Sequence, residues 1–376
     1  MVTLSEIFRQ YGEEYLKEYD GRITYEQKKA LFNITGCGTG DLGRAGYRCK
    51  ECGEIHYVNK SCGNRHCPSC QNHKTGEWLV KQLKDLLPCD YFFYTFTLPG
   101  ILRTAAQYDS NIVYKAMFKA SSAALKELAE DGRFIGGKIG FTGVMHTWNR
   151  DKTYHPHIHY IIPGGGITED GFEWIPADEK LVVHTSPLAQ LFRGKLVSIL
   201  EKQGILKKYG IAKYRLYKCK LVIDCENAGN GRNVLKYLSN YVFRVAVTNN
   251  NIIKLEDDKV TFRYIKNGDK VYTCSTMHAV KFIRMFMLHI LPSGFMKVRH
   301  YGFMANRYRK ENIAKIRQQI DENGYYENQI IPEIRKIEEE RENSKVKCPA
   351  CNGKLIFCGI ELPTGRKINQ EEKQPP

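Results

Sequence analysis

The chain has 376 residues, enough for one large catalytic domain with appendages, because hydrophobic cores stop growing at roughly 250–300 residues. Its 57 lysines and arginines outnumber 41 aspartates and glutamates, and this net charge of +16 indicates a polyanionic partner, most simply nucleic acid. The charges are spread along the chain and no stretch reaches about 18 apolar residues, which argues against membrane-surface and transmembrane proteins.

Two helices are expected first, over 3–19 and from Thr24 through Leu31 and Phe32. Thr3 with Glu6, and Thr24 with Gln27, form capping-box patterns at their starts. Both helices are predicted to be packing elements.

Cysteines dominate the next segment. Thirteen cysteines would suggest disulfides in a secreted protein, but no apolar leader follows Met1, so we expect a cytoplasmic protein with zinc sites. Two Cys-x-x-Cys knuckles fourteen residues apart predict one tetrahedral zinc in an N-terminal zinc ribbon, held by Cys49, Cys52, Cys67 and Cys70. Four residues are left to hold a second ion, to replace one of these ligands or to be buried thiols and surface histidines: Cys37, Cys62, His66 and His73. Arg65 is a candidate contact to the DNA backbone.

Strands are expected over 91–98, 134–148 and 154–162, with a helix over 107–130 before the second of them. The last strand carries His155, His157 and His159 at alternate positions, so the three imidazoles share one face and Ile158, Tyr160 and Ile162 share the other. A lone strand histidine is usually structural, whereas three at period two predict a metal site. If the polar turn over 149–153 pairs His146 with His157, His146 joins the same face.

A helix is expected over 187–207, a strand from Tyr214 to Ile223, and a further helix from about Arg232. On that helix Tyr237 and Tyr241 project side by side, with Asn233 on their face and Arg244 beside them. Paired tyrosines are commonly core aromatics, but here the adjacent apolar stripe is already supplied by Val234, Leu238 and Val242.

The C-terminal third is expected to contain short strands over 252–274, a helix over 278–291 and a charged helix over 326–343. Cations alternate with aromatic rings at Arg299, Arg307, Arg309 and Lys310, a mixture that suits single-stranded DNA or a solvated basic helix. Cys348, Cys351 and Cys358 make a partial zinc knuckle that lacks a fourth ligand, and the last dozen residues are expected to be disordered. The expected division is 1–90, 91–310 and 311–376.

Several of these motifs, in this order, resemble the two-tyrosine HUH transposases of rolling-circle insertion sequences, the IS91 type. The resemblance spans most of the chain and rests on Ser61-Cys62-Gly63-Asn64-Arg65-His66-Cys67-Pro68, His146-Thr147-Trp148, the histidine strand running into Gly164-Gly165-Gly166, Tyr237-Leu238-Ser239-Asn240-Tyr241, Leu291-Pro292-Ser293-Gly294-Phe295 and Arg299-His300-Tyr301-Gly302. It implies an α+β fold with a central antiparallel sheet and helices, the palm of HUH and Rep-like nucleases, besides the zinc ribbon and a small zinc-knuckle-like tail.

The resemblance also implies the chemistry of a bacterial, DNA-associated enzyme. His157 and His159 would help to hold one Mg²⁺ or Mn²⁺, with His146 as the preferred third ligand over His155 or Asn233. Tyr237 and Tyr241 would each attack a single-stranded DNA phosphate and form a 5′-phosphotyrosine, without a fixed order between them. The expected partner is single-stranded DNA, as transposon ends and target; a homo-oligomer is one option and no membrane partner is expected.

Three other functions fit parts of the sequence. A rolling-circle replication initiator or a relaxase would use the same chemistry on other DNA ends. A histidine-triad nucleotide hydrolase would use a similar histidine strand with a histidine nucleophile, but needs neither the ribbon nor the tyrosine pair. A non-catalytic zinc DNA-binding protein would form no covalent product.

Overall fold

A computed structural model of the chain describes residues 2–71, 74–171, 173–177, 182–230, 235, 245–265, 271–305, 307–343, 346–363 and 367–369. The chain divides into two compact units. The cysteine unit comprises Met1–Lys74, Phe243–Ile290 and Lys336–Pro376, and the histidine unit comprises Thr75–Val242 and Leu291–Arg335. The domain boundaries predicted from the sequence, at residues 90 and 310, concern parts that fold independently. They stay a prediction. None of the described helices is long and apolar enough to cross a bilayer.

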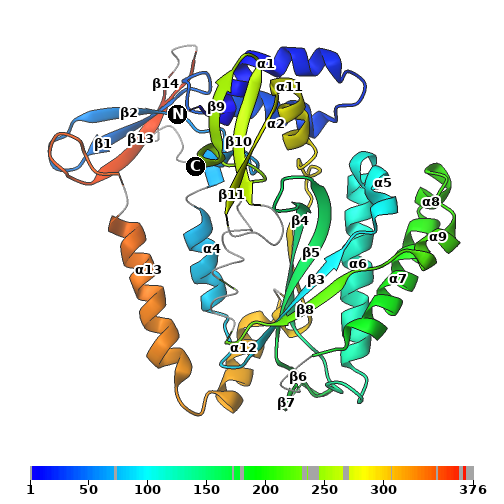
Figure 1. Cartoon of the computed structure of the whole chain (residues 1–376). Coiled ribbons are helices and arrows are strands. Elements are labelled where there is room, and N and C mark those ends of the chain that lie inside the picture. Colours follow the sequence, from blue (N-terminus) through cyan, green and yellow to red (C-terminus); the bar gives the residue numbers. More distant parts are fainter. Residues whose placement is uncertain are drawn as a thin grey trace, which may run out of the picture. The chain divides into compact units, whose positions relative to one another are not determined.

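The histidine unit is built on a five-stranded sheet of order β12-β4-β5-β3-β8, in which every neighbouring pair is antiparallel (Figure 1). Its strands are β3 (Tyr91–Thr97), β4 (Phe141–Trp148), β5 (Tyr154–Pro163), β8 (Ile223–Asn227) and β12 (Val298–Tyr301). The α+β class with a central antiparallel sheet is therefore confirmed.

One face of this sheet packs against helices. Ile158, Tyr160 and Ile162 of β5 are fully buried there, as the alternation predicted, and the Tyr160 hydroxyl lies 2.7 Å from the Ser121 hydroxyl. The Phe96 ring of β3 packs edge-on against Phe192 at 5.1 Å. The helices and short turns of this layer are η1 (Gly100–Leu102), α5 (Arg103–Tyr108), α6 (Ser110–Ala129), α7 (Thr185–Lys202), α8 (Ile205–Lys208) and α9 (Lys213–Lys218).

The expected strand from Tyr214 to Ile223 is wrong over most of its length, because its first half is helix α9 and only Ile223 enters β8. The physical reason lies in burial. Leu216 is the one buried side chain of α9, while Tyr214 and Tyr217 are exposed, so no alternating buried face supports a strand there. Arg193 donates to the carbonyls of Tyr217 and Cys219 and satisfies the end of this short helix.

The other face of the sheet carries the histidines, and near β12 it meets α12. Arg309 of α12 contacts the ring nitrogens of His300 on β12 at 3.4–3.5 Å. The remaining elements of the unit are α4 (Lys74–Leu83), β6 (Gly165–Ile167), β7 (Trp174–Pro176), η3 (Gly302–Met304), α12 (Arg309–Ile320), η4 (Tyr326–Ile330) and the start of α13 (Ile331–Asn343). The glycine run after β5 is needed for close packing, because a Cβ on Gly165 would lie 2.3 Å from the Trp174 ring.

The cysteine unit contains a helical layer on a small sheet. Both predicted capping boxes are present, at the starts of α1 (Leu4–Glu18) and α2 (Tyr25–Thr35). Phe8 packs on Phe286 of α11 (Ala279–Met287) at 5.5 Å, and Phe262 packs on Phe282 at 5.3 Å. The sheet has the order β11-β10-β9, and its elements are η2 (Asn249–Asn251), β9 (Ile252–Glu256), β10 (Lys259–Ile265) and β11 (Tyr272–His278).

A second sheet of the cysteine unit joins the two ends of the chain. Its order is β14-β13-β1-β2, from β1 (Arg44–Cys49), β2 (Ile55–Asn59), β13 (Leu355–Glu361) and β14 (Lys367–Asn369), with α3 (Pro68–Gln71) following in the chain (Figure 1). The C-terminal knuckle thus leads directly into β13, the strand that pairs with β1 of the N-terminal knuckle, and is not a separate tail. β14 lies within the dozen residues that we expected to be disordered.

Candidate functional site

Three histidines meet on the face of the β4–β5 hairpin that lies opposite the buried Ile158, Tyr160 and Ile162. His146 pairs directly opposite His157, which confirms the predicted register, and His159 lies opposite Val144 on the same face. The ring centroids are 5.4 Å apart for His146 and His157, 4.8 Å for His146 and His159, and 4.5 Å for His157 and His159. One nitrogen of each ring lies within 4.8 Å of those of the other two, so one ion could contact all three.

Hydrogen bonds orient two of the rings. The His157 Nδ1 donates to the backbone carbonyl of His155 at 2.7 Å. Since a carbonyl can only accept, this bond places the proton on Nδ1 and leaves the Nε2 lone pair of His157 available for a ligand. The His159 Nδ1 lies 2.9 Å from the hydroxyl of Thr95, directly opposite on β3. Sequence reasoning missed Thr95; its signal is that Thr95 and Thr97 are the two non-aromatic residues of the strand and share one face.

Burial keeps the imidazoles of His157 and His159 uncharged. It lowers the pKa of His157 to about 4, with a minor opposing effect of the hydrogen bond to His155. It lowers the pKa of His159 well below the ordinary value, and the neighbouring His157 adds to that shift. Neutral imidazole is the form that binds metal ions. The rings are also held by packing, because Phe93 stacks on His159 at 4.7 Å and Trp148 on His146 at 5.4 Å.

The alternatives to His146 as third ligand fare differently. His155 is not among the three converging rings, and Arg103 donates to its Nδ1 at 3.1 Å. Asn233 lies outside the described residues, as do Tyr237, Tyr241 and Arg244. Of the predicted tyrosine helix, the structure describes Leu235, which is helical and buried.

The cysteines group differently from the prediction. Cys37, Cys62, Cys67 and Cys70 form one group, and Cys49, Cys52, Cys348 and Cys351 form another, each with all Sγ atoms within 4.8 Å. The expected set of Cys49, Cys52, Cys67 and Cys70 is therefore wrong. The reason is strand pairing: β1 ends at Cys49 and pairs with β13, which brings the C-terminal knuckle beside the first one, while Cys67 and Cys70 flank the start of α3.

Both groups have the dimensions of a tetrahedral thiolate site. Zn–S bonds of about 2.3 Å at tetrahedral angles separate the sulfurs by roughly 3.8 Å. In the first group Cys70 Sγ lies 3.6 Å from the Sγ atoms of Cys37 and Cys62, and Cys67 Sγ lies 3.6 Å from that of Cys37. His66 is not part of this group, and His73 lies outside the described residues. Cys37 and Cys62, expected as leftovers, are thus full members.

The predicted DNA-binding cations are not equivalent. Arg309 is 5% exposed and pairs with Asp85 at 2.5 Å, so its assignment as a surface contact to DNA is corrected: it is a buried structural residue. Arg299 is half-buried and its guanidinium lies over the Phe118 ring at 4.2 Å; its contact to DNA stays a prediction. Arg307 and Lys310 are exposed, as is Arg65 in the cysteine unit, and their contacts to DNA stay predictions.

Comparisons with known proteins agree with these features. Residues 140–312 match a family model described as "Putative transposase", and residues 7–98 match one described as "Transposase zinc-binding domain". The relative "Putative transposase y4qJ" of Sinorhizobium fredii is 34% identical over 381 residues, covering 95% of each chain. The "Transposase for insertion sequence element IS801" of Pseudomonas savastanoi pv. phaseolicola is 24% identical over 319 residues, covering 79% of this chain and 75% of that protein. No solved structure gives a significant match.

The relative that covers nearly the whole chain fixes the family, and the zinc-binding model agrees with the cysteine groups in requiring structural zinc. The resemblance inferred from the motifs is confirmed. A transposase acts on DNA by cutting and joining strands, which accounts for the basic charge. The chain therefore belongs to the IS91 family of transposases, and its N-terminal part is the zinc-binding domain of that family.

Proposed function

We propose that this transposase cuts and rejoins single-stranded DNA through a 5′-phosphotyrosine intermediate, in rolling-circle transposition, as an HUH enzyme. Tyr237 and Tyr241 are the nucleophiles, and a divalent ion is held by His146, His157 and His159. The observation that carries the proposal is the convergence of these three buried imidazoles on one face of an antiparallel sheet, with burial lowering the pKa of His157 and of His159.

The histidine site fits such an ion. The carbonyl of His155 accepts the proton on His157 Nδ1, and the hydroxyl of Thr95 contacts the Nδ1 of His159. Outer hydrogen bonds of this kind fix ring orientation in metal centres. When bound, the ion supplies Lewis-acid polarisation of the scissile phosphate. Three imidazole nitrogens suit Mn²⁺ better than Mg²⁺, because Mg²⁺ strongly prefers oxygen ligands.

The tyrosines carry the covalent step. The phenolate oxygen of one tyrosine attacks phosphorus, the P–O3′ bond breaks, and the departing 3′ oxygen takes up a proton. Rejoining reverses the step: a 3′ hydroxyl attacks the phosphotyrosine and releases the phenol, so no external energy source is needed. A second tyrosine one helical turn away can receive another strand while the first is occupied.

The other components follow from the same arrangement. Cys37, Cys62, Cys67 and Cys70 hold one structural zinc ion in the cysteine unit. The exposed cations Arg65, Arg307 and Lys310 contact phosphates, and Arg244 does so near the tyrosines. The DNA partner is single-stranded, at the transposon ends and at the target. A homo-oligomer stays an option.

A covalent-adduct assay tests the proposal. The substrate is single-stranded DNA spanning the ends of the insertion sequence that encodes the chain, labelled 3′ of the cut so that the label stays with a 5′-phosphotyrosine. With Mn²⁺, wild type is expected to give a labelled protein band that survives SDS and acid and is lost with a chelator. The Tyr237→Phe, Tyr241→Phe double variant should give none. A band that persists in this variant, or an acid-labile one, contradicts the tyrosine assignment.

A further inference from the structure

The second cysteine group brings together two knuckles that lie at opposite ends of the chain. Cys49 and Cys52 come from the end of β1, and Cys348 and Cys351 precede β13. The Cys49 and Cys351 sulfurs are 3.4 Å apart, and the Cys52 and Cys348 sulfurs are 3.7 Å apart. The zinc-binding family model covers residues 7–98 and therefore includes only half of this group.

The two knuckles have the same backbone conformation. In the first, the Cys49 amide donates to the carbonyl of Glu54 at 2.9 Å and the Gly53 amide donates back to Cys49 at 3.1 Å. In the second, the Cys348 amide donates to Gly353 at 2.9 Å and the Asn352 amide donates back to Cys348 at 2.8 Å. The residue after each second cysteine has a positive φ, +75° at Gly53 and +59° at Asn352. Each turn thus presents two thiols to the same side, as the two halves of a zinc ribbon do.

The surrounding backbone locks the two knuckles together. β1 pairs with β13 from Arg44 opposite Glu361 to Cys49 opposite Leu355, and the Lys50 amide donates to the carbonyl of Lys354 at 2.9 Å. Gly353 leaves room for this approach, since a Cβ there would lie 2.8 Å from the Cys49 sulfur. The His56 Nε2 lies 3.2 Å from the Cys348 sulfur. An N–H donated to that sulfur would offset part of the negative charge of a four-thiolate site.

We propose that Cys49, Cys52, Cys348 and Cys351 bind a second structural Zn²⁺, which fastens the C-terminal segment to the N-terminal zinc-binding domain. Four thiolates at tetrahedral spacing leave no open position, so this ion is structural. Binding would contribute directly to the stability of the β1–β13 pairing, because the ligands come together only when that pairing forms. His56 supports the site by its hydrogen bond and is not a ligand.

Zinc content of the full-length protein tests this site. Wild type is expected to contain about two zinc ions per chain, and the Cys348→Ser, Cys351→Ser variant about one. Cys274→Ser is the matched control, since Cys274 is an exposed cysteine outside both groups, and it should keep about two. His56→Ala should also keep about two, which separates a supporting residue from a ligand. About one zinc in wild type, or no loss in the double variant, overturns the proposal.

Alkylation mapping of wild type keeps the test valid if the double variant does not fold. Zinc-bound thiolates react slowly with iodoacetamide, and mass spectrometry identifies the protected cysteines. Cys49, Cys52, Cys348 and Cys351 are expected to be protected as one set and to become reactive together on chelation, whereas Cys274 reacts from the start. Rapid alkylation of Cys348 and Cys351 while zinc remains bound contradicts the site.

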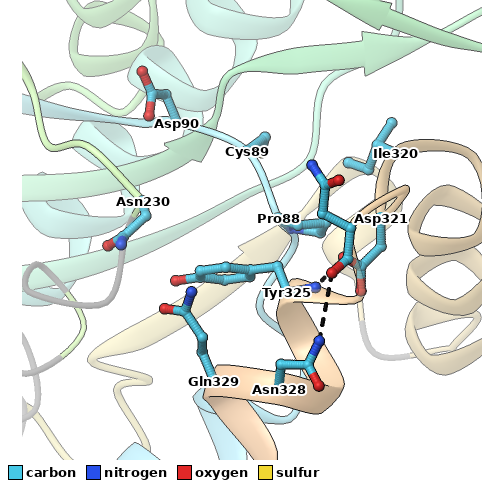
Figure 2. A pocket seen from close by; sticks show the side chains of 10 residues that line it. Pro88, Cys89, Asp90, Asn230, Ile320, Asp321, Tyr325, Asn328 and Gln329 are labelled. Carbon is cyan, nitrogen blue, oxygen red and sulfur yellow. Dashed lines mark hydrogen bonds between the residues drawn. The ribbon is translucent and has the colours of Figure 1, made fainter.

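The histidine unit also contains a cavity of about 460 Å³, where the chain enters β3 and leaves β8 (Figure 2). Amide side chains line it from two directions, Asn230 after β8 and Asn328 and Gln329 of η4, and the Tyr325 ring extends between them. Among the described residues of its lining, the acidic ones are Asp90 and Asp321. The Asp321 carboxylate accepts from the backbone amides of Tyr325 at 2.6 Å and Tyr326 at 3.1 Å, so it is engaged within the wall.

The described part of this lining suits a nucleobase. Among the described lining residues there are two carboxylates and no lysine or arginine, while amides offer a donor and an acceptor together, as base edges require, and an aromatic ring offers a surface for stacking. The cavity includes Asp90, just before β3. Thr95, which contacts His159, lies five residues further along the chain, or roughly 16 Å along the strand direction. A few nucleotides of extended single strand would bridge that distance.

We infer that this cavity binds one unpaired base of the DNA strand a few nucleotides from the cut phosphate, and so contributes to recognition of the transposon end. The inference rests on the proposed single-strand chemistry. Gln329, which is exposed at the cavity, reads the base edge together with the neighbouring amides, and Tyr325 packs against its face.

Stepwise abasic substitution in the single-stranded end oligonucleotide tests the pocket, with binding and adduct formation measured for each position. In wild type one abasic position should weaken binding by roughly tenfold, as loss of a stacked base does. In Gln329→Ala, the loss of affinity caused by the abasic nucleotide at that position alone should fall to about threefold or less. The control is Gln318→Ala, which should behave as wild type because Gln318 is an exposed amide of α12 outside the cavity. If adducts form but no position depends on Gln329, the pocket is refuted while the chemistry stands. If wild type forms no adduct, both fail.

Discussion

Arg309 distinguishes a buried structural cation from a DNA contact, and its replacement has a predictable cost. Its side chain is 6% exposed and its guanidinium pairs with Asp85 at 2.5 Å and with Gln82 at 3.2 Å. Burial lowers the pKa of Arg309 and raises the pKa of Asp85, although each is the counter-ion of the other. The pair is thus held together against a desolvation cost, and removal of Arg309 leaves the buried Asp85 carboxylate without the guanidinium that contacts it.

Arg309→Ala should therefore lower the free energy of unfolding by about 3–5 kcal/mol. For a unit of this size each kcal/mol changes the melting temperature by roughly 2–4 °C, so a fall of roughly 6–20 °C is expected in a thermal melt. The double replacement Asp85→Leu, Arg309→Met should recover most of that loss, because apolar side chains of similar volume replace a buried pair at little cost.

Arg307 provides the matched control. It is exposed and its guanidinium lies over the Tyr308 ring at 5.1 Å. Arg307→Ala should leave the melting temperature within about 1–2 °C, because surface substitutions change stability little. It should reduce the slope of log binding constant against log salt for single-stranded DNA by about 0.7. The assignment of Arg309 as a buried structural residue would be refuted if Arg309→Ala melted like wild type and showed the smaller salt dependence of DNA binding expected for Arg307→Ala.

Three further outcomes follow from the histidine unit. Thr95→Val should raise the Mn²⁺ concentration for half-maximal cleavage by roughly 10–100-fold, with the rate at saturating metal nearly unchanged, since Thr95 only orients His159; an unchanged metal titration would count against it. Gly143→Ala should destabilise the unit by about 1–3 kcal/mol in a denaturant melt, because the new Cβ would lie 2.4 Å from the Tyr160 ring; a melt identical to wild type would show that the ring moves freely. Cleavage should need less Mn²⁺ than Mg²⁺, because imidazole nitrogens favour Mn²⁺; equal requirements in parallel titrations would argue for an oxygen-rich site.

The histidine site was predictable because it is local. His157 and His159 alternate within one strand, and a five-residue turn brings His146 opposite His157, so the hairpin register alone assembles the triad. The apolar face of β5 was predictable for the same reason. Thr95 comes from β3, more than sixty residues earlier, and only the pairing of β3 with β5 identifies it as the partner of His159.

The cysteine sites show where sequence spacing misleads. Cys49-Cys52 and Cys67-Cys70 have the spacing of a ribbon, but the strand that pairs with β1 comes from the other end of the chain, 302 residues from Cys49 to Cys351. No local pattern encodes such a pairing. Arg309 was misassigned for a related reason, because its position in a basic, aromatic stretch gives no sign that Asp85 lies beside it in the folded chain.

The central claim is that the tyrosine pair and the histidine triad act on one phosphate. Mass spectrometry of the trapped protein–DNA adduct tests it most directly, because trypsin places both tyrosines in a single peptide, 237–244. Wild type is expected to carry a nucleotide on this peptide through an acid-stable bond, and no adduct is expected when His157 and His159 are replaced by alanine. A nucleotide on any other peptide, or an adduct that forms without the two histidines, would contradict it.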